Sequence, residues 1–259
     1  MSTSAERAAI EVFWELHRGL TKQGPGSDAS TRRALSLVPE LPRAPEILDL
    51  GCGPGRQTLA LARETGGRVT AVDRIPPFLS QLRESARIAG VEKRIQIFEG
   101  DMADLPYPDE SFDLLWSEGA IYNIGFGHGL KTWRRLLRPG CAVAVSEATW
   151  LTDRPAKSVR RFWATHYPEM QSVEANERSA RAAGYRLLGS FVLPESEWWD
   201  DYYTPIEARI RSLREHRDNE NWTAALDIHE EEIRVIRDCR GSFGYVFFVL
   251  QKPRAIGSG

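Results

Sequence analysis

The sequence is poor in cysteine, in net charge and in long apolar stretches. Its 3 cysteines, Cys52, Cys141 and Cys239, form no CxxC pair within 259 residues, so neither a disulfide framework nor a zinc site is expected. The formal net charge of -2 gives no electrostatic reason to expect a nucleic-acid partner. No apolar run approaches the roughly 18 residues of a membrane span, and the polar N-terminus does not resemble a signal peptide. We therefore expect a cytoplasmic protein with neither a nucleic-acid nor a membrane partner.

The sequence does contain an ordinary hydrophobic fraction, 42%, distributed in two alternating patterns. Helical spacing of apolar residues predicts two N-terminal helices, over about residues 9–20 and 30–37. Short apolar, β-rich runs then predict strands at 47–50, 68–72, 94–98, 112–116 and 141–146, separated by helices at 57–64, 78–89 and 130–137. Strands that alternate with helices pair in parallel through right-handed crossovers, and ligands bind beyond the carboxyl ends of such strands.

The C-terminal part of the sequence departs from this strict alternation. It predicts helices at 157–166 and 172–183, a strand at 185–193, helices at 206–216 and 222–237, and a strongly apolar last strand at 242–250. We therefore expect an α/β fold with a doubly wound, mostly parallel sheet of seven strands, N-terminal helices and a helical insertion between the last two strands. The whole chain, 1–259, is interpreted as a single domain with a helical cap or lid at 1–44, a core at 45–150 and a C-terminal half at 151–259.

A glycine-rich loop follows the first predicted strand. Gly51, Gly53 and Gly55 would let the backbone turn sharply and approach a ligand, and the next helix offers its N-terminal amides to a polar group. Such a loop alone is equally typical of a tight strand-to-helix connection. Asp73 and Asp101, which end the second and third strands, change the balance, because carboxylates there can bind ribose hydroxyls and an adenine amino group. Each aspartate alone could be a helix cap or turn residue, but together with the glycines they favour a nucleoside site.

Dinucleotide binding is the competing interpretation of this loop. The GxGxxG fingerprint requires a third glycine where this sequence has the bulky Arg56. An NAD(P)-dependent enzyme is therefore less favoured than a protein that binds a nucleoside bearing an amino acid.

Several segments resemble the motifs of class I S-adenosylmethionine-dependent methyltransferases, whose fold is Rossmann-like. They are EILDLGCGPG at 46–55, GDMADLPY at 100–107, SFDLLW at 111–116 and LRPG at 137–140, where Cys141 replaces the usual second glycine. WSEGAIYNIG at 116–125 and QGPGS at 23–27 resemble the methyltransferase-domain-11/25-like small-molecule subgroup of that superfamily. The resemblance covers about residues 46–150 and implies S-adenosylmethionine as cofactor, S-adenosylhomocysteine as product and no metal.

The resemblance also implies a role for each matching position. The methionine part of the cofactor would lie on the glycine loop and the residues around it, Asp49, Gly51, Cys52, Gly53, Gly55 and Gln57. Asp73 and Arg74 would hold the ribose, and Asp101 and Met102 the adenine. Ser117 and Glu118 would lie below the methionine and face the acceptor. Gln23 would belong to a lid, residues 23–27, folded over the cofactor.

Methyl transfer from a sulfonium mainly requires alignment and the exclusion of water, and a base is needed only if the acceptor carries a proton. The candidate catalytic residues are Glu118, Tyr122 and His166, although a histidine is more often a surface residue than a base. Asn123, Glu147 and an aromatic set are further candidates for the acceptor site. Trp163 and Tyr167, four residues apart, are more typical of the core, and Trp198 with Trp199 could anchor a cover over the sheet edge. The other aromatic candidates are Trp150, Tyr202 and Tyr203. Glu118 and Glu147 beside aromatic rings would suit a cationic or amine acceptor.

Two functions of different classes follow. The first is a methyltransferase acting on O, N or S of a small molecule, as a monomer or a homodimer. The second is a non-catalytic S-adenosylmethionine sensor or partner subunit. A metal-assisted mechanism is not favoured, because Asn123 and Glu147 alone do not form a ligand set at the ends of strands four and five.

Overall fold

The computed structural model describes residues 3–216, 220–239 and 241–254. Its central sheet has the strand order β3-β2-β1-β4-β5-β8-β7, in which only β8 runs antiparallel to its neighbours, and a two-residue strand β6 pairs with β5. This arrangement confirms the predicted doubly wound, mostly parallel sheet. The strands are β1 (Glu46–Leu50), β2 (Arg68–Asp73), β3 (Ile95–Glu99), β4 (Phe112–Glu118), β5 (Leu137–Trp150), β6 (Gln171–Ser172), β7 (Arg186–Val192) and β8 (Phe243–Gln251).

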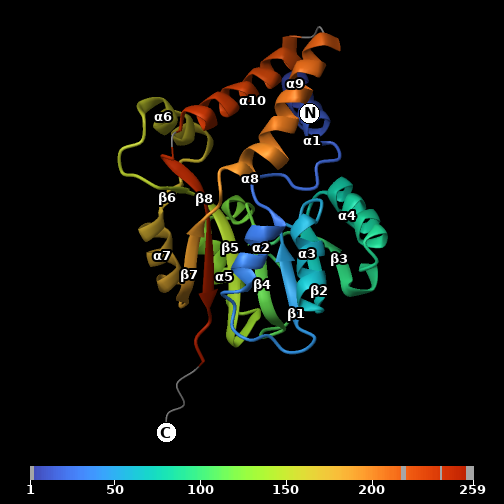
Figure 1. Ribbon diagram of the computed structural model, residues 1–259, viewed down its shortest axis with the longest axis vertical. Coiled ribbons are helices and arrows are strands. Elements are labelled where there is room, and N and C mark those ends of the chain that lie inside the picture. The colour runs from blue at the N-terminus through green and yellow to red at the C-terminus, as the bar shows by residue number, and fades with distance from the viewer. Residues whose placement is uncertain (1–2, 217–219, 240, 255–259) are drawn as a thin grey trace.

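Helices connect the strands and also form a separate group above one end of the sheet (Figure 1). The helices are α1 (Ser4–His17), α2 (Asp28–Leu35), α3 (Arg56–Thr65), α4 (Pro76–Ile88), α5 (Phe126–Trp133), α6 (Lys157–His166), α7 (Val173–Ala182), α9 (Thr204–His216) and α10 (Glu220–Asp238). Shorter helical turns are η1 (Glu92–Arg94), η2 (Ile121–Asn123), α8 (Ser196–Trp198) and η3 (Trp199–Tyr203). In the described part of the chain no helix combines the length and apolar character that crossing a membrane requires.

The two faces of the sheet are covered by different helices because successive side chains of a strand point to opposite sides. Ile47 and Leu114 pack in a cluster with residues of α2, α3 and α4. Their neighbours Leu48 and Leu115 pack in a second cluster with residues of α5 and α7. Both clusters are fully buried at the central strands β1 and β4, so the carboxyl ends of these strands are held rigidly.

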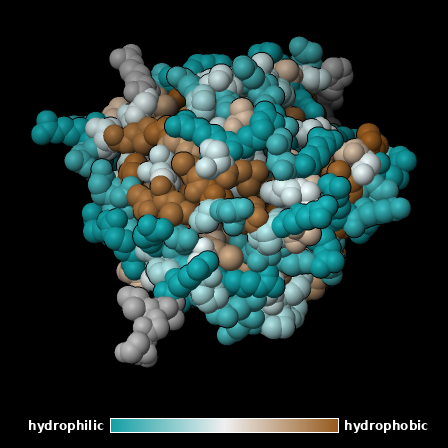
Figure 2. All heavy atoms as spheres, turned by 60° about the horizontal axis from the view of Figure 1, so that its bottom comes forward, coloured by the Kyte–Doolittle hydropathy of each residue, from teal (hydrophilic) through white to brown (hydrophobic). Residues whose placement is uncertain are grey.

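The helices α1, α9 and α10 form the roof that lies above the carboxyl ends of the strands (Figure 1). Their buried apolar residues, among them Val12, Ile210 and Ile233, belong to one cluster that is distinct from the two sheet clusters. The first helix and the last helix meet here, because Trp222 Nε1 of α10 donates a hydrogen bond of 3.2 Å to Glu11 Oε2 of α1. In the oblique view of Figure 2, in which the lower end comes forward, hydrophobic side chains gather in the middle of the face and mainly hydrophilic ones surround them.

Several predicted element boundaries differ from the structure, and two of the differences have a clear physical reason. The helix expected at 130–137 is α5, Phe126–Trp133, and Leu137 already begins β5, where it pairs with Phe112 of β4. Backbone pairing with β4 therefore overrides the helical spacing of the apolar residues before Pro139. The second helix also begins earlier than expected, because Ser27 is its N-cap and accepts a hydrogen bond from the Ser30 amide.

Candidate active site

A cavity of about 460 Å³ lies between the carboxyl ends of β1, β2 and β4 and the roof of helices. It extends from the glycine-rich loop at 51–55 to a group of aromatic residues of α6, η3 and β8. We refer to these two parts as the cofactor end and the acceptor end. The position matches the general rule that ligands of doubly wound sheets bind beyond the carboxyl ends of the strands.

The glycine-rich loop presents bare backbone to the cofactor end. The amides of Gly51 and Cys52 both donate to the Val72 carbonyl at 2.9 Å, which fixes the loop against β2. Gly51 has φ +71°, and a Cβ there would lie 2.4 Å from the Cβ of Ala120, so only glycine fits. A Cβ at Gly53 would meet only Gln23, at 3.8 Å, so this side of the loop opens into the cavity toward Gln23.

Gly55 serves packing rather than ligand contact. It does not line the cavity, and a Cβ there would lie 2.2 Å from Leu82 Cδ1 of α4. The absence of a side chain at Gly55 therefore lets α4 approach the start of α3. The prediction that Gly55 contacts the cofactor gains no support from this position.

Asp49 likewise lies beneath the loop and not on the cavity wall. Its buried carboxylate accepts hydrogen bonds from Thr58 Oγ1 at 2.5 Å and Gln57 Nε2 at 3.5 Å, and burial raises its pKa to about 7. Gln57 does line the cavity and also donates to the Cys52 carbonyl at 3.1 Å. Asp49 thus anchors the first turn of α3 to the end of β1. It supports the glycine-rich loop without lining the cavity.

Asp73 and Asp101 both line the cofactor end, as the sequence predicted. Asp73 accepts hydrogen bonds from the amides of Gly53 at 2.8 Å and Ile75 at 3.0 Å, so it also shapes the loop. Burial raises the pKa of Asp73, and these backbone hydrogen bonds oppose that rise. Asp101 accepts from the Ala103 amide at 2.9 Å and lies 3.4 Å from Arg74 Nη1.

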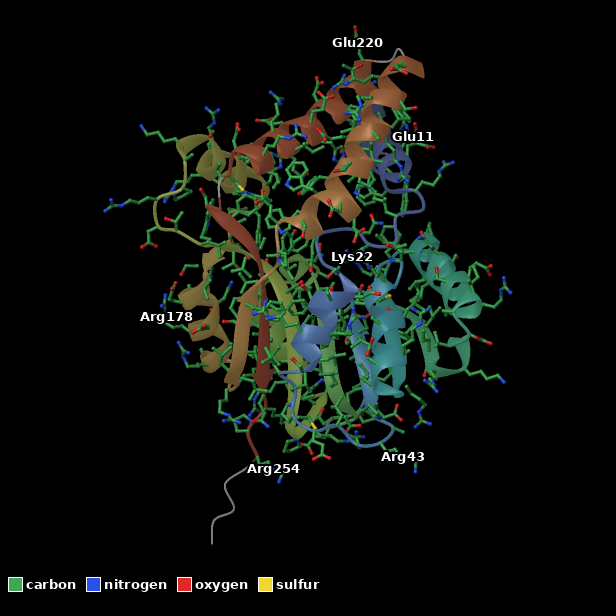
Figure 3. The ribbon with its side chains drawn as sticks, viewed as in Figure 1. Glu11, Lys22, Arg43, Arg178, Glu220 and Arg254 are labelled. Carbon is green, nitrogen blue, oxygen red and sulfur yellow. The ribbon has the colours of Figure 1, made fainter. Side chains whose placement is uncertain are left out.

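A buried ion pair between Lys22 and Glu118 separates the two ends of the cavity. Lys22 is 8% exposed and Glu118 is 6% exposed, and both line the cavity. Figure 3 shows Lys22 where the roof meets the upper end of the sheet. Glu118 Oε1 also accepts hydrogen bonds from Thr31 Oγ1 of α2 and Trp116 Nε1, both at 2.8 Å. The carboxylate of Glu118 is therefore occupied by three donors, which leaves little capacity to act as a base.

Ser117 does not face the acceptor, although the resemblance placed it there. Its hydroxyl donates to the Leu50 carbonyl at 2.9 Å, and the side chain is fully buried. Ser117 therefore joins β4 to β1 beneath the cavity.

Gln23 is the clearest indication that the cofactor end holds a polar ligand. Its amide nitrogen and oxygen are buried and have no hydrogen-bond partner among the described residues, although they lie beside the glycine loop. A buried amide without partners is costly, so a ligand that both donates and accepts would satisfy it. An amino acid group, which carries an ammonium and a carboxylate, fits this donor set and the neighbouring Lys22.

The acceptor end is lined mainly by aromatic side chains. Tyr122 and Tyr167 approach each other with ring centroids 5.8 Å apart, and Tyr122 is 44% exposed, at the rim of the cavity. His166 also lines the cavity and is exposed; its ring lies 4.2 Å from that of Phe162. The remaining aromatic lining comes from four segments that are distant in sequence: Phe13, Trp163, Tyr202, Tyr203 and Tyr245.

Two carboxyl groups lie at the acceptor end, Glu232 on the cavity wall and Glu147 behind it. Glu147 of β5 is 1% exposed, and neither of its oxygens has a hydrogen-bond partner among the described residues. Burial raises the pKa of Glu147 to about 8, which favours its protonated form at neutral pH, and the nearby Tyr167 hydroxyl opposes that rise. Burial also raises the pKa of Glu232, which accepts a hydrogen bond of 2.9 Å from the Tyr203 hydroxyl.

His17 of α1 faces the same space from the roof. Its Nδ1 lies 2.7 Å from the Phe13 carbonyl and its Nε2 lies 3.2 Å from the Tyr202 hydroxyl. Burial lowers the pKa of His17 to about 4, so the imidazole is neutral. Burial also lowers the pKa of His229, whose ring centroid lies 6.2 Å from that of His17.

Known proteins resemble this chain in sequence. The family described as "Methyltransferase domain" matches residues 47–140, which include the glycine loop, Asp73 and Asp101. The 27-O-demethylrifamycin SV methyltransferase of Amycolatopsis mediterranei is 26% identical over 254 residues, which cover 94% of this chain and 93% of that protein. The family match, the full-length relative and the shared fold together support a member of the class I S-adenosylmethionine-dependent methyltransferase superfamily.

Two further comparisons extend this result for the methyltransferase. The glycine/sarcosine/dimethylglycine N-methyltransferase of Actinopolyspora halophila is 35% identical over 138 residues, 51% of this chain but only 24% of that protein. A solved S-adenosylmethionine-dependent methyltransferase from Geobacter sulfurreducens, in complex with S-adenosylhomocysteine, has a TM-score of 0.78 at 22% identity. That likeness covers 94% of this chain and 98% of the other, so the fold is shared over nearly the whole length.

The cavity of the methyltransferase brings together most of the residues that the sequence singled out. The cofactor end contains Gln23, Gly51, Cys52, Gly53, Gln57, Asp73, Arg74, Asp101, Met102 and Glu118, and the acceptor end contains Tyr122 and His166. Asp49, Gly55 and Ser117 lie behind the wall. The sequence interpretation missed Phe13, His17, Lys22, His229, Glu232 and Tyr245. Helical spacing offered one signal, because His17 lies four residues after Phe13, an apolar residue within the first predicted helix.

Proposed function

We propose that the protein transfers a methyl group from S-adenosylmethionine to O, N or S of a small molecule. The observation that carries this proposal is the single cavity that joins the glycine loop and Asp73 to an aromatic, enclosed chamber. The whole cavity, of about 460 Å³, is of the size at which proteins enclose cofactors and small ligands. The rifamycin relative, named for an O-methylation, and the sarcosine relative, named for an N-methylation, both support a small acceptor.

In this proposal different residues of the cofactor end bind different parts of the cofactor. Asp73, flanked by Arg74, binds the ribose hydroxyls, and Asp101 with Met102 binds the adenine. Gln23, the backbone at 51–53 and Lys22 hold the amino acid group. Gln57 supports the loop through the Cys52 carbonyl. Asp49, Gly55 and Ser117 act indirectly, through the helix and strand contacts that position the loop.

S-adenosylmethionine supplies an activated methyl group on a sulfonium, so the protein does not need to activate a leaving group. Its residues orient the acceptor and exclude water, which is the main requirement for such a displacement. The roof of α1, α9 and α10 provides the exclusion, and the rings of the acceptor end provide the orientation. Tyr122 and His166 remain candidates for contact with the acceptor. Glu118 contributes by fixing Lys22 and Thr31 of the N-terminal segment above the sheet.

Titration calorimetry with S-adenosylhomocysteine tests this proposal. Asp73→Ala is expected to weaken binding about 100-fold, because two charge-assisted hydrogen bonds to the ribose are lost. Glu99→Ala, which removes an exposed carboxylate at the end of the neighbouring strand β3, is the matched control and is expected to bind like the wild type. Equal affinities of the Asp73 variant and the wild type would refute the assignment of this end.

A panel of metabolites with labelled S-adenosylmethionine distinguishes the enzyme from a non-catalytic sensor. Transfer of label to any small acceptor supports the enzyme, whereas tight binding with no transfer across the panel favours the sensor. We also propose that residues 1–44, 45–150 and 151–259 form one domain, because all three contribute to the same cavity wall. A cytoplasmic location and a monomeric or homodimeric state stay predictions.

A further inference from the structure

We propose that the acceptor is a hydroxyl compound with a flat apolar body, and that its proton passes through the Tyr202 hydroxyl to Nε2 of His17. The proposal rests on the proposed methyl transfer and specifies its acceptor. It follows from the charge of the acceptor end and from the hydrogen bonds of His17.

The acceptor end offers little counter-charge to a charged substrate. Among the described residues that line the cavity, the only lysine or arginine side chains are Lys22, paired with Glu118, and Arg74, beside Asp101 at the cofactor end. Burial raises the pKa values of Glu147 and Glu232, which favours their neutral forms. A carboxylate in this space would lose its hydration without a partner, and an ammonium would gain a partner only if a buried carboxyl also ionised, so both are expensive. Glu118, one of the two carboxylates expected to hold a cationic acceptor, is already bound by three donors.

Aromatic rings on several sides favour a flat apolar body. Tyr122 and Tyr167 form one side, and Tyr202 packs on Tyr203 with ring centroids 4.8 Å apart on another. Tyr245 of β8 contributes a further ring from the sheet. Flat apolar ligands gain both buried area and ring contacts in such surroundings.

The hydrogen bonds of His17 determine which of its nitrogens can take a proton. A carbonyl oxygen only accepts, so Nδ1 must carry the hydrogen that it donates to the Phe13 carbonyl at 2.7 Å. Because the ring is neutral, Nε2 has a free lone pair and accepts from the Tyr202 hydroxyl at 3.2 Å. The Tyr202 hydroxyl therefore donates its hydrogen to Nε2 of His17, and its oxygen can accept a proton from the cavity.

The other groups around His17 do not compete for this proton. Burial lowers the pKa of His229 of α10, which makes it a weaker base, and Arg209 of α9 donates to the Leu16 carbonyl at 2.6 Å. Glu232 is bound by the neighbouring Tyr203. Tyr202 of η3 is thus the group that connects the His17 lone pair to the cavity.

The reaction balances without a further reactant. The acceptor oxygen forms a bond to the methyl carbon as the carbon–sulfur bond breaks, and the electron pair stays on sulfur as a thioether. The acceptor proton moves to the Tyr202 oxygen, and the Tyr202 proton moves to Nε2 of His17. The products are a methyl ether, S-adenosylhomocysteine and a proton that His17 returns to solvent, which its low pKa favours.

A binding experiment tests the acceptor class. The complex with S-adenosylhomocysteine is titrated with phenol, 2-naphthol and 2-anthrol, and with 2-naphthylmethylamine, which is an ammonium ion at pH 7. We expect at least one hydroxyl probe to bind about tenfold or more tightly than the ammonium ion, because the latter lacks a counter-charge. Tighter binding of the ammonium ion, or no binding of any hydroxyl probe, would overturn the proposal. Failure of the wild type to bind S-adenosylhomocysteine would instead refute the proposed function.

A kinetic experiment tests the proton path with the hydroxyl probe that binds best and its thiol analogue. An aryl thiol ionises readily and needs no base. Tyr202→Phe and His17→Gln are expected to lower kcat for the hydroxyl about 100-fold, with smaller changes in KM and in the thiol reaction. Tyr185→Phe removes a buried hydroxyl that donates to the Leu130 carbonyl away from the cavity, and it controls for general loss of a hydroxyl. Tyr202→Phe keeps the ring, so it remains informative if His17→Gln fails to fold. Equal losses with both acceptors, or no loss with the hydroxyl, would contradict the proton path.

Discussion

The two ends of the cavity are built in different ways. The cofactor end consists of short contiguous segments at the carboxyl ends of β1, β2 and β3, and its polar groups are mostly backbone amides and aspartates. The acceptor end consists of single side chains from α1, α6, η3, α10 and β8, and its polar groups are hydroxyls, imidazoles of lowered pKa and carboxyls of raised pKa. In the proposed function the first end binds a charged, invariant ligand, whereas the second surrounds an uncharged one.

This difference indicates that binding and selection of ligands depend on separate structural layers. The sheet and its loops would bind the cofactor whatever covers them, because Asp73 and the glycines are fixed by backbone hydrogen bonds. The roof decides which acceptor fits. Lys22 and Glu118 form a buried connection between the two layers.

The largest expected effect comes from breaking that connection. Glu118→Gln leaves the buried ammonium of Lys22 without its partner, so we expect the free energy of unfolding to fall by about 3–5 kcal/mol. Lys22→Met combined with Glu118→Gln removes both charges and is expected to cost less than the single change. Urea denaturation measures both. Glu110→Gln, in the half-exposed pair with Lys252, is the control and should change stability little. If the double variant is as unstable as the single one, the ion pair is not what joins the layers.

A second prediction concerns the neutral character of the acceptor end. The pKa of Glu147 is raised to about 8 in the folded protein, above its ordinary value of 4.5. Between these two values the folded state holds a proton that the unfolded state has released. Stability therefore falls as the pH rises through this window, by up to about 1.4 kcal/mol per pH unit.

Glu147→Gln is expected to remove that slope, so the variant should be more stable than the wild type at pH 8 and similar to it near pH 4.5. Thermal unfolding across the pH range measures this difference. Glu84→Gln changes an exposed carboxyl on α4 and serves as the control. An unchanged slope in the Glu147 variant would mean that Glu147 holds no extra proton in the folded state. The acceptor end would then carry a negative charge, like the cofactor end.

The smallest effect is expected for Arg56, which joins the two layers at the surface. It donates to Asp28 of α2 at 2.8 Å and to Asp201 of η3 at 2.6 Å, and both carboxylates are more than 40% exposed. Arg56→Gln is therefore expected to lower the free energy of unfolding by about 1 kcal/mol or less, by the urea midpoint. Arg87→Gln, in the exposed pair with Glu84, gives the matched reference. A loss of several kcal/mol would show that the layers are coupled through the surface as well.

The sequence was most informative where structure depends on neighbours in the chain. The glycine loop, Asp73 and Asp101 could be predicted because a strand, a turn and a helix start within a few residues of one another. The predicted helix at 130–137 was wrong at both boundaries. It ends before Leu137 because Leu137 pairs with Phe112, a residue of another strand. The antiparallel strand β8 was correctly expected as a strand, but its place between β5 and β7 depends on pairing over long distances.

The acceptor end could not be predicted in the same way. His17 and Tyr202 are 185 residues apart, and Lys22 and Glu118 are 96 apart. No local pattern indicates that such residues meet, because the contact depends on how the roof packs on the sheet. Ser117 and Asp49 show the converse, since residues at motif positions can point away from the ligand into the supporting hydrogen bonds.

The place of β8 has a consequence for the order in which the protein folds. The strand β8, late in the sequence, lies inside the sheet between β5 and β7. The helix α1 can pack on α10 only after α10 has been synthesised, because Trp222 lies 211 residues after its partner Glu11. During synthesis the strands from β1 to β5 can pair before either event, because contacts close in sequence form first. We therefore expect a nascent chain that can bind S-adenosylhomocysteine before it has an acceptor chamber, and whose β5 edge stays open to aggregation until residue 251 has emerged.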